Sequence, residues 1–161
     1  MKEIELSRGF VTTVDNEDYA DLIRWKWYAW TPREGLTYAI RSVKKANGKQ
    51  GNPVRMHRYL VDAPDGMQVD HKNGNCLDNR RSNLRICTST QNQRNQHKIY
   101  GAVPYKGVRK NGNGYEARLR YNKKLIGLGT YKDPENAAIA YDKAAVKYFG
   151  EYACINKGIT L

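Results

Sequence analysis

The stretch from Gln68 to Asn95 constrains the fold of this 161-residue chain most, because turn-forming and apolar segments alternate in it around an adjacent carboxylate and imidazole. Its first, apolar-flanked run predicts a short strand that ends at Asp70 and His71. A polar loop begins at Asn73-Gly74, a dipeptide typical of hairpin turns. The pattern therefore predicts a strand that delivers an acid and an imidazole to the edge of an ordered loop.

A second short strand around residues 84–86 and a helix over residues 91–96 are predicted to follow. Ser89 or Thr90 can cap that helix. We expect strand, loop, strand and helix to form a small frame. The frame would bring the acid and the imidazole opposite Asn92 or Asn95.

Such a grouping suits the hydrolysis of phosphodiester bonds. Carboxylate and amide oxygens are hard ligands for Mg²⁺, Mn²⁺ or Ca²⁺, and they leave coordination positions open for water and phosphate. An imidazole with an unperturbed pKa of about 6.5 can accept a proton from water near neutral pH. Arg80, Arg81 and Arg85 follow in the loop and second strand, where they are predicted to contact DNA phosphates or, alternatively, to form a solvated face.

Four motifs carry a resemblance to a known family. They are D-H at 70–71, N-x-N at 73–75, L-D-N-R-R-S-N-L-R at 77–85 and Q-N-Q-R-N at 91–95. In this order they resemble the HNH endonucleases with the ββα-metal motif, and in particular the homing endonucleases of phages and mobile introns. Likeness continues upstream to about Arg55, through an M-H-R segment that contains His57. We expect His57 to be a hydrogen-bonded structural histidine.

The resemblance implies a role for each matching residue. His71 would be the general base that activates water, and Asn83 would orient it through its other ring nitrogen. Asp70 would bind a single divalent metal, most simply Mg²⁺ with Mn²⁺ as the alternative. Asn92 would be the second metal ligand, with Asn95 as the alternative.

The net charge of +12 predicts attraction to a polyanion, which for this chemistry means double-stranded DNA. No apolar run approaches the roughly twenty residues of a membrane span, and the first residues lack a signal-peptide core. We therefore expect a cytoplasmic, monomeric protein with no membrane association and no protein partner. Three cysteines without C-x-x-C spacing argue against both a disulfide framework and a structural zinc site.

Upstream of the catalytic stretch, alternation over residues 2–14 predicts two short strands turned at 7–9, followed by a helix capped by Asp15. Trp25 and Trp27 are predicted to share one face of a strand that pairs with residues 36–43. We expect the three tryptophans of this region to form core. Together these elements predict a nuclease domain over residues 1–98, with a catalytic core at about residues 55–97.

After a linker at 99–104, residues 105–161 predict three strands and a helix. In the middle strand, apolar residues alternate with Arg118 and Arg120, so that one sheet face is apolar and the other basic. Asp133 is predicted to cap the helix and Gly150 to end it.

This second part resembles the APETALA and ethylene-response-factor DNA-binding domain in Y-K-G-V-R at 105–109, Y-E-A-R-L-R at 115–120 and L-G-T-Y at 128–131. The resemblance implies DNA contacts through Arg109, Arg118 and Arg120. Gly127 stands where plant members have a base-contacting tryptophan, so the target sequence does not carry over.

The sequence as a whole thus predicts an α+β protein: a ββα-metal HNH nuclease domain, followed by a three-stranded antiparallel sheet packed on one helix. The expected activity is metal-dependent nicking or double-strand cleavage of DNA by a homing-type, phage or mobile-element enzyme. The alternative is a non-catalytic, DNA-binding transcription regulator.

Overall fold

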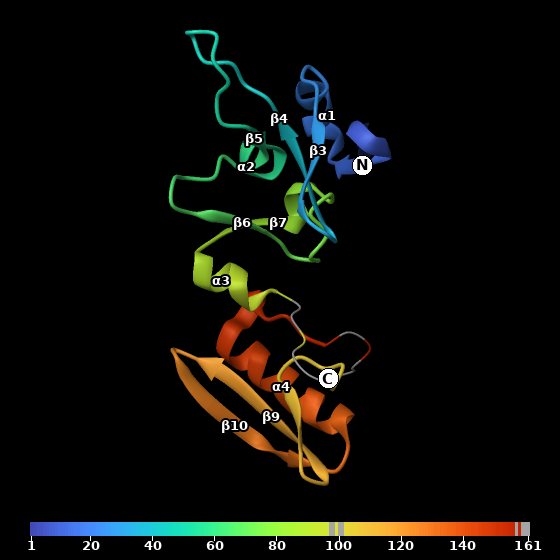
Figure 1. Cartoon of the computed structure of the whole chain (residues 1–161), viewed down its shortest axis with the longest axis vertical. Helices are drawn as coiled ribbons and strands as arrows, with labels where there is room; N and C mark the ends of the chain where they lie inside the picture. Colours follow the sequence, from blue (N-terminus) through green and yellow to red (C-terminus); the bar gives the residue numbers. More distant parts are fainter. Residues whose placement is uncertain (97–98, 100–101, 157, 159–161) are drawn as a thin grey trace. The chain divides into compact units, whose positions relative to one another are not determined.

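The computed structural model describes residues 1–96, 99, 102–156 and 158 (Figure 1). The chain divides into two compact units, Met1–Ser89 and Thr90–Leu161. The division falls earlier in the sequence than the predicted linker at 99–104, part of which lies outside the described residues. Each unit is described below by itself.

The first unit begins with an antiparallel hairpin, in agreement with the predicted pair of strands. Its elements are β1 (Lys2–Glu5), the 3₁₀ turn η1 (Ser7–Gly9) and β2 (Val11–Val14). Helix α1 (Asn16–Leu22) follows. Asp15 occupies the N-cap position, but its side chain makes no capping bond. It accepts a hydrogen bond from the backbone N–H of Arg81 instead, so this residue ties the helix start to the distant loop (2.7 Å).

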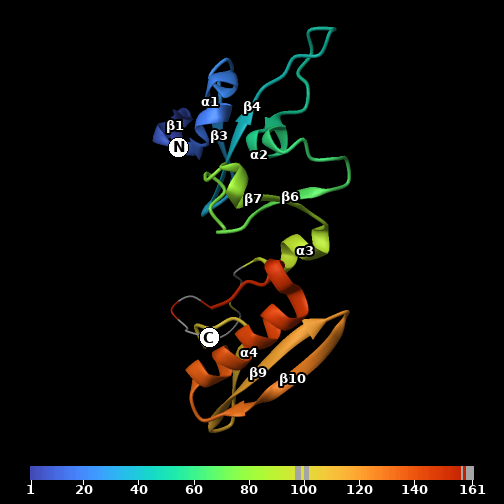
Figure 2. The same ribbon diagram turned by 180° about the vertical axis from the view of Figure 1, so that it is seen from behind.

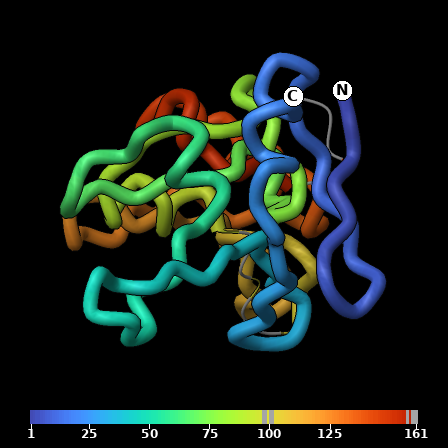
Figure 3. The backbone as a smooth tube through the Cα atoms, turned by 90° about the horizontal axis from the view of Figure 1, so that it is seen from above, coloured from blue at the N-terminus to red at the C-terminus, as the bar shows by residue number. Residues whose placement is uncertain are grey.

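A three-stranded antiparallel sheet comes next, in the order β3 (Tyr28–Arg33), β4 (Leu36–Arg41) and β5 (Val54–Arg55). Between β4 and β5 the chain forms a loop that extends away from the rest of this unit (Figures 1 and 3). Strand β3 begins after the first two tryptophans, so the prediction that they share a strand face is wrong.

The prediction of a three-tryptophan core is also wrong. Trp27 is 3% exposed and donates its indole N–H to the carbonyl of Leu22, whereas Trp25 and Trp30 are 42% and 38% exposed. Each of these two rings carries an arginine guanidinium over its face, from Arg41 and Arg55 respectively. Trp25 and Trp30 therefore pack against arginine side chains and are not part of the buried core.

The predicted strand–loop–strand is confirmed. Helix α2 (Met56–Leu60) leads to β6 (Gln68–His71), and the 3₁₀ turn η2 (Arg81–Asn83) leads to β7 (Leu84–Cys87), which pairs antiparallel with β6. One apolar cluster joins the hairpin, the sheet, α2 and this second hairpin. Its buried members are Ile4, Leu6, Val14, Leu22, Trp27, Ala39, Met56, Leu60, Val69 and Leu84.

The second unit has the predicted three strands and helix. Its elements are β8 (Val108–Asn111), β9 (Gly114–Tyr121), β10 (Lys124–Tyr131), α4 (Pro134–Phe149) and η3 (Gly150–Tyr152). The helix α3 (Ser89–Arg94) spans the boundary between the units. The sheet order is β10-β9-β8, and α4 lies across one face of the sheet (Figures 1 and 2).

Small side chains let α4 approach the sheet closely. Ala137, Ala138 and Ala145 are fully buried against the apolar face of β9. Asp133 accepts a hydrogen bond from the backbone N–H of Asn136 at 2.8 Å, as its predicted cap role requires. In the part of the chain that the structure describes, none of the helices is long and apolar enough to span a bilayer.

Candidate active site

Strands β6 and β7 place the predicted acid and imidazole in the interior of the first unit. Asp70 lies opposite Arg85 and His71 opposite Leu84 in the antiparallel register. Both Asp70 and His71 are buried. Because β6 ends at His71, the imidazole stands where the ordered loop begins.

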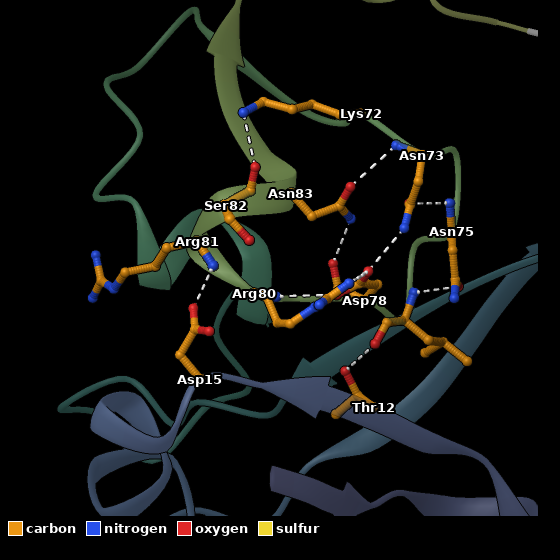
Figure 4. A network of polar contacts seen from close by, with 11 residues as sticks. Thr12, Asp15, Lys72, Asn73, Asn75, Asp78, Arg80, Arg81, Ser82 and Asn83 are labelled. Carbon is orange, nitrogen blue, oxygen red and sulfur yellow. Dashed lines mark hydrogen bonds and ion pairs between the residues drawn. The ribbon is translucent and has the colours of Figure 1, made fainter. Parts of the chain in front are cut away.

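Asn83 organises that loop (Figure 4). Its side-chain oxygen accepts a hydrogen bond from the backbone N–H of Asn73 at 3.1 Å, and its amide nitrogen donates to the backbone carbonyl of Asp78 at 2.8 Å. Asn83 therefore joins the backbone at Asn73 to the backbone at Asp78, on the two sides of the loop. Both of these bonds go to the backbone of the loop, and the predicted role of Asn83 in orienting His71 stays a prediction.

The asparagine at His71 is Asn79. Its side-chain oxygen lies 3.2 Å from Nε2 of His71, and its amide nitrogen donates to Oγ1 of Thr12 at 2.7 Å. Thr12 in turn donates to the backbone carbonyl of Leu77 at 2.7 Å. Asn79 and Thr12 are both completely buried. Sequence reasoning missed Asn79 because it treated the loop's asparagines as turn formers, although it lies within the L-D-N-R motif.

Backbone pairing supports this junction between the hairpin and the loop. The N–H of Thr13 donates to the carbonyl of Leu77 at 2.9 Å, and the N–H of Asn79 donates to the carbonyl of Thr13 at 2.8 Å. The N-terminal hairpin is thus joined directly to the loop that holds His71. Strand β2 is therefore part of the site's framework.

Burial lowers the pKa of His71, while the hydrogen bond to Asn79 and the nearby Asp70 and Asp78 act in the opposite direction. A lowered pKa keeps an imidazole neutral near neutral pH. His71 is thus in the form that can accept a proton.

Arg85 forms a buried ion pair with the predicted metal ligand. Its Nε and Nη2 donate to Oδ2 of Asp70 at 2.8 Å and 2.6 Å, and both side chains are largely inaccessible. The pairing compensates the burial of both charges. Arg85 was predicted to contact DNA. That contact stays a prediction, and in the structure the guanidinium of Arg85 is bonded to Asp70.

The other two arginines of the loop also have carboxylate partners. Arg80 binds Asp78 through Nε and Nη2 at 2.7 Å and 2.6 Å, and Arg81 binds Asp18 at 2.7–3.1 Å. Hydrogen bonds from Arg80 lower the pKa of Asp78. Both arginines keep substantial exposure, so their predicted role at DNA phosphates stays a prediction.

His57 lies next to His71, with ring centroids 5.3 Å apart in an edge-to-face arrangement. Tyr38 contacts both rings, at 5.4 Å and 6.4 Å between centroids. The side chain of His57 is buried, and its Nδ1 has no hydrogen-bond partner. Its predicted structural placement is confirmed, but the predicted hydrogen bond is missing at that nitrogen. Burial, followed by the neighbouring His71 and two arginines, lowers its pKa to about 3.

The predicted metal ligands fall in different units: Asp70 in the first, Asn92 and its alternative Asn95 in the second. Among the described residues, no group of three His, Cys, Asp or Glu side chains is gathered to hold a metal ion. The described residues thus do not offer the ligands of a closed zinc site. The carboxylate of Asp70 fits Mg²⁺, which proteins bind through one or two carboxylates and which completes its shell with water and phosphate oxygens.

Basic residues of the second unit line a pocket of about 430 Å³. Arg109, Arg118 and Arg120, predicted to contact DNA, lie there together with Lys106. Arg109 is ion-paired with Glu116 of the neighbouring strand. The structure thus brings the three predicted arginines to one place.

Comparison with known proteins agrees with this site. The sequence profile of the HNH endonuclease family matches residues 62–94. An HNH endonuclease of Acanthamoeba polyphaga mimivirus is 34% identical over 124 residues, which make up 68% of this chain and 65% of the viral protein.

Two plant proteins match over shorter segments. An AP2-like ethylene-responsive transcription factor of Arabidopsis thaliana is 45% identical over 64 residues, 37% of this chain and 19% of the plant protein. An ethylene-responsive transcription factor of the same plant is 44% identical over 64 residues, 37% of this chain and 15% of that protein. The chain thus spans less than two thirds of each of these relatives, and the plant matches give only weak support for the second resemblance.

The matched segment contains the buried acid–imidazole pair and the asparagines that hold its loop. Residues 62–94 are therefore similar to the HNH endonuclease family, and most of the chain is similar to a viral HNH endonuclease.

Proposed function

We propose that this protein is a divalent-metal-dependent DNA endonuclease that hydrolyses phosphodiester bonds, with His71 as the general base. The observation that carries the proposal is the buried pair of Asp70 and neutral His71 at the edge of an ordered loop, inside the segment that matches the HNH family. A proton acceptor beside a hard oxygen ligand is a combination suited to the hydrolysis of DNA.

In the proposed reaction a water oxygen forms a new bond to phosphorus while its proton passes to His71. The bond from phosphorus to the leaving strand's oxygen breaks, and that oxygen takes up a proton to become a hydroxyl group. Asp70 would be a ligand of the metal. A bound Mg²⁺ or Mn²⁺ would supply stabilisation of the negative charge on the phosphate.

Arg80 and Arg81 are proposed to help bind the DNA backbone near the cut. Their exposed guanidinium groups keep donors beyond those used on Asp78 and Asp18. Arg85 is proposed to act mainly through Asp70, since its guanidinium is committed to that carboxylate.

The second unit is proposed to bind double-stranded DNA and to add affinity and some specificity. The convergence of Arg109, Arg118 and Arg120 on one pocket, the net charge of +12 and the two plant transcription-factor matches support this proposal. The motif likeness described above further supports a homing-type enzyme of a phage or mobile element. Either nicking or double-strand cleavage is compatible with a single site of this kind.

Supercoiled plasmid tests the catalytic proposal. The wild-type protein with Mg²⁺ or Mn²⁺ is expected to yield relaxed or linear DNA, and both a chelator and His71→Ala are expected to abolish the product. Lys49→Ala, in the loop between β4 and β5, is the matched surface control and should cleave like the wild type.

The plant matches favour a second candidate, a DNA-binding transcription regulator without catalysis. A discrete shift of labelled DNA in a gel, with intact plasmid under every metal condition, would favour this candidate and refute the nuclease. Cleavage that persists in His71→Ala would instead refute the assignment of the base.

A further inference from the structure

The hydrogen bonds that join Thr12, Asn79 and His71 run in one direction in the structure. The backbone carbonyl of Leu77 can only accept, so the hydroxyl hydrogen of Thr12 is used on it. Oγ1 of Thr12 must then act as the acceptor toward Asn79. Asn79 therefore turns its amide nitrogen to Thr12 and its carbonyl oxygen to His71.

An amide oxygen is an acceptor, so the ring nitrogen facing it must carry the hydrogen. That nitrogen is Nε2 of His71, at 3.2 Å. In a neutral imidazole only one nitrogen is protonated, and the lone pair is then on Nδ1. This series of hydrogen bonds thus favours one tautomer of His71. It starts from the backbone carbonyl of Leu77, which can only accept a hydrogen bond.

We propose that Asn79 and Thr12 are positioning residues that fix His71 as the Nε2–H tautomer and so make Nδ1 the nitrogen that accepts the proton from water. The catalytic part of this inference rests on the proposed nuclease function. It assigns a role to strand β2, which lies far from the matched HNH segment in the sequence.

Burial strengthens the selection. Thr12 and Asn79 are completely buried and His71 is nearly so. A reversed Asn79 would direct its NH₂ group at Nε2, and its oxygen would take the hydroxyl hydrogen of Thr12 away from the carbonyl of Leu77. The flipped arrangement is disfavoured for as long as the Thr12 hydroxyl is present.

Thr12→Val removes the hydroxyl at nearly constant shape and releases the amide of Asn79 to turn. Thr12→Ser retains the hydroxyl and should rescue the wild-type behaviour. Thr13→Val is the matched control, because Thr13 enters this junction through its backbone.

The tautomer can be measured by long-range ¹H–¹⁵N correlation on full-length protein labelled at histidine, without metal or DNA. The chain has only three histidines, so His57→Phe and His97→Gln complete the assignment. At about pH 8, well above the unperturbed histidine pKa, we expect the Nε2–H pattern for His71 in the wild type, Thr12→Ser and Thr13→Val. We expect Thr12→Val to show a substantial Nδ1–H population.

The single-turnover rate of cleavage should fall in variants in which His71 loses the Nε2–H tautomer. Thr12→Val is expected to lose at least about tenfold in rate, and less than the 10²–10⁴-fold that a general base contributes, with DNA affinity unchanged. A wild-type His71 in the Nδ1–H form overturns the inference without any variant, even if Thr12→Val fails to fold. An unchanged tautomer in folded Thr12→Val also overturns it. A wild type with the expected tautomer and no cleavage refutes the nuclease proposal while the assignment of Asn79 and Thr12 to the tautomer stands.

Discussion

Replacing His57 by phenylalanine should change how the stability of the first unit depends on pH. The ring of His57 is 5% exposed and its pKa is about 3, against about 6.5 in an unfolded chain. Between these values the unfolded state binds a proton at this position and the folded state does not. The contribution of His57 to the free energy of unfolding is therefore fully present above about pH 6.5 and is lost as the pH falls toward 3.

The size of the effect follows from linkage. Each pH unit below the pKa of the unfolded state lowers the free energy of unfolding by about 1.4 kcal/mol. A fall to about pH 5 should therefore lower the free energy of unfolding of the wild type by about 2 kcal/mol through His57 alone. His57→Phe keeps an aromatic ring against His71 and removes this contribution. The lowered pKa of Asp78 acts in the same direction in both proteins and cancels in the comparison.

Urea unfolding followed by tryptophan fluorescence measures this difference, because all three tryptophans lie in the first unit. We expect the wild type to lose about 2 kcal/mol more than the variant between about pH 7.5 and pH 5. At about pH 7.5 we expect the variant to be at least as stable, since it no longer buries the unpartnered Nδ1. Equal losses in the two proteins would refute a buried neutral His57.

Three further outcomes are expected. Replacing Arg118 and Arg120 together should flatten the dependence of log K on log salt for DNA binding by up to about 1.8, and an unchanged slope in a titration would reject both contacts. Asn83→Ala removes both bonds that close the loop and should lower the free energy of unfolding by about 2–4 kcal/mol in the fluorescence assay; a loss below about 0.5 kcal/mol would contradict its role. Gly107→Ala should unfold the second unit at lower temperature than Gly112→Ala by circular dichroism. Both positions have positive φ, but of the two only Gly107 would place a Cβ in overlap with the ring of Tyr141.

Local patterns predicted much of the fold. Alternation and turn residues were sufficient for the hairpin at the N-terminus, for β6 and β7, and for the three strands of the second unit. The cap at Asp133 and the helix end at Gly150 were also predicted, since caps depend on neighbours within a few residues. Asp15 shows the limit of such reasoning, because a distant backbone N–H, that of Arg81, takes its carboxylate.

The site was predicted less completely. Residue chemistry and motif likeness singled out Asp70 and His71, but they did not point to Asn79, whose side-chain oxygen lies at Nε2 of His71. Which asparagine faces the imidazole depends on Thr12, a residue of another hairpin that lies 67 positions from Asn79. No local pattern encodes that contact. Three arginines that look alike in sequence likewise differ in burial and partner, because each meets a different carboxylate.

The most direct test of the account is the single-turnover rate of plasmid cleavage by wild type and His71→Ala, with DNA affinity measured on the same preparations. We expect the variant to bind DNA as the wild type does and to cleave it at least about 10²-fold more slowly. Equal cleavage rates at equal affinity would contradict the claim that the imidazole of His71 accepts the proton from the attacking water.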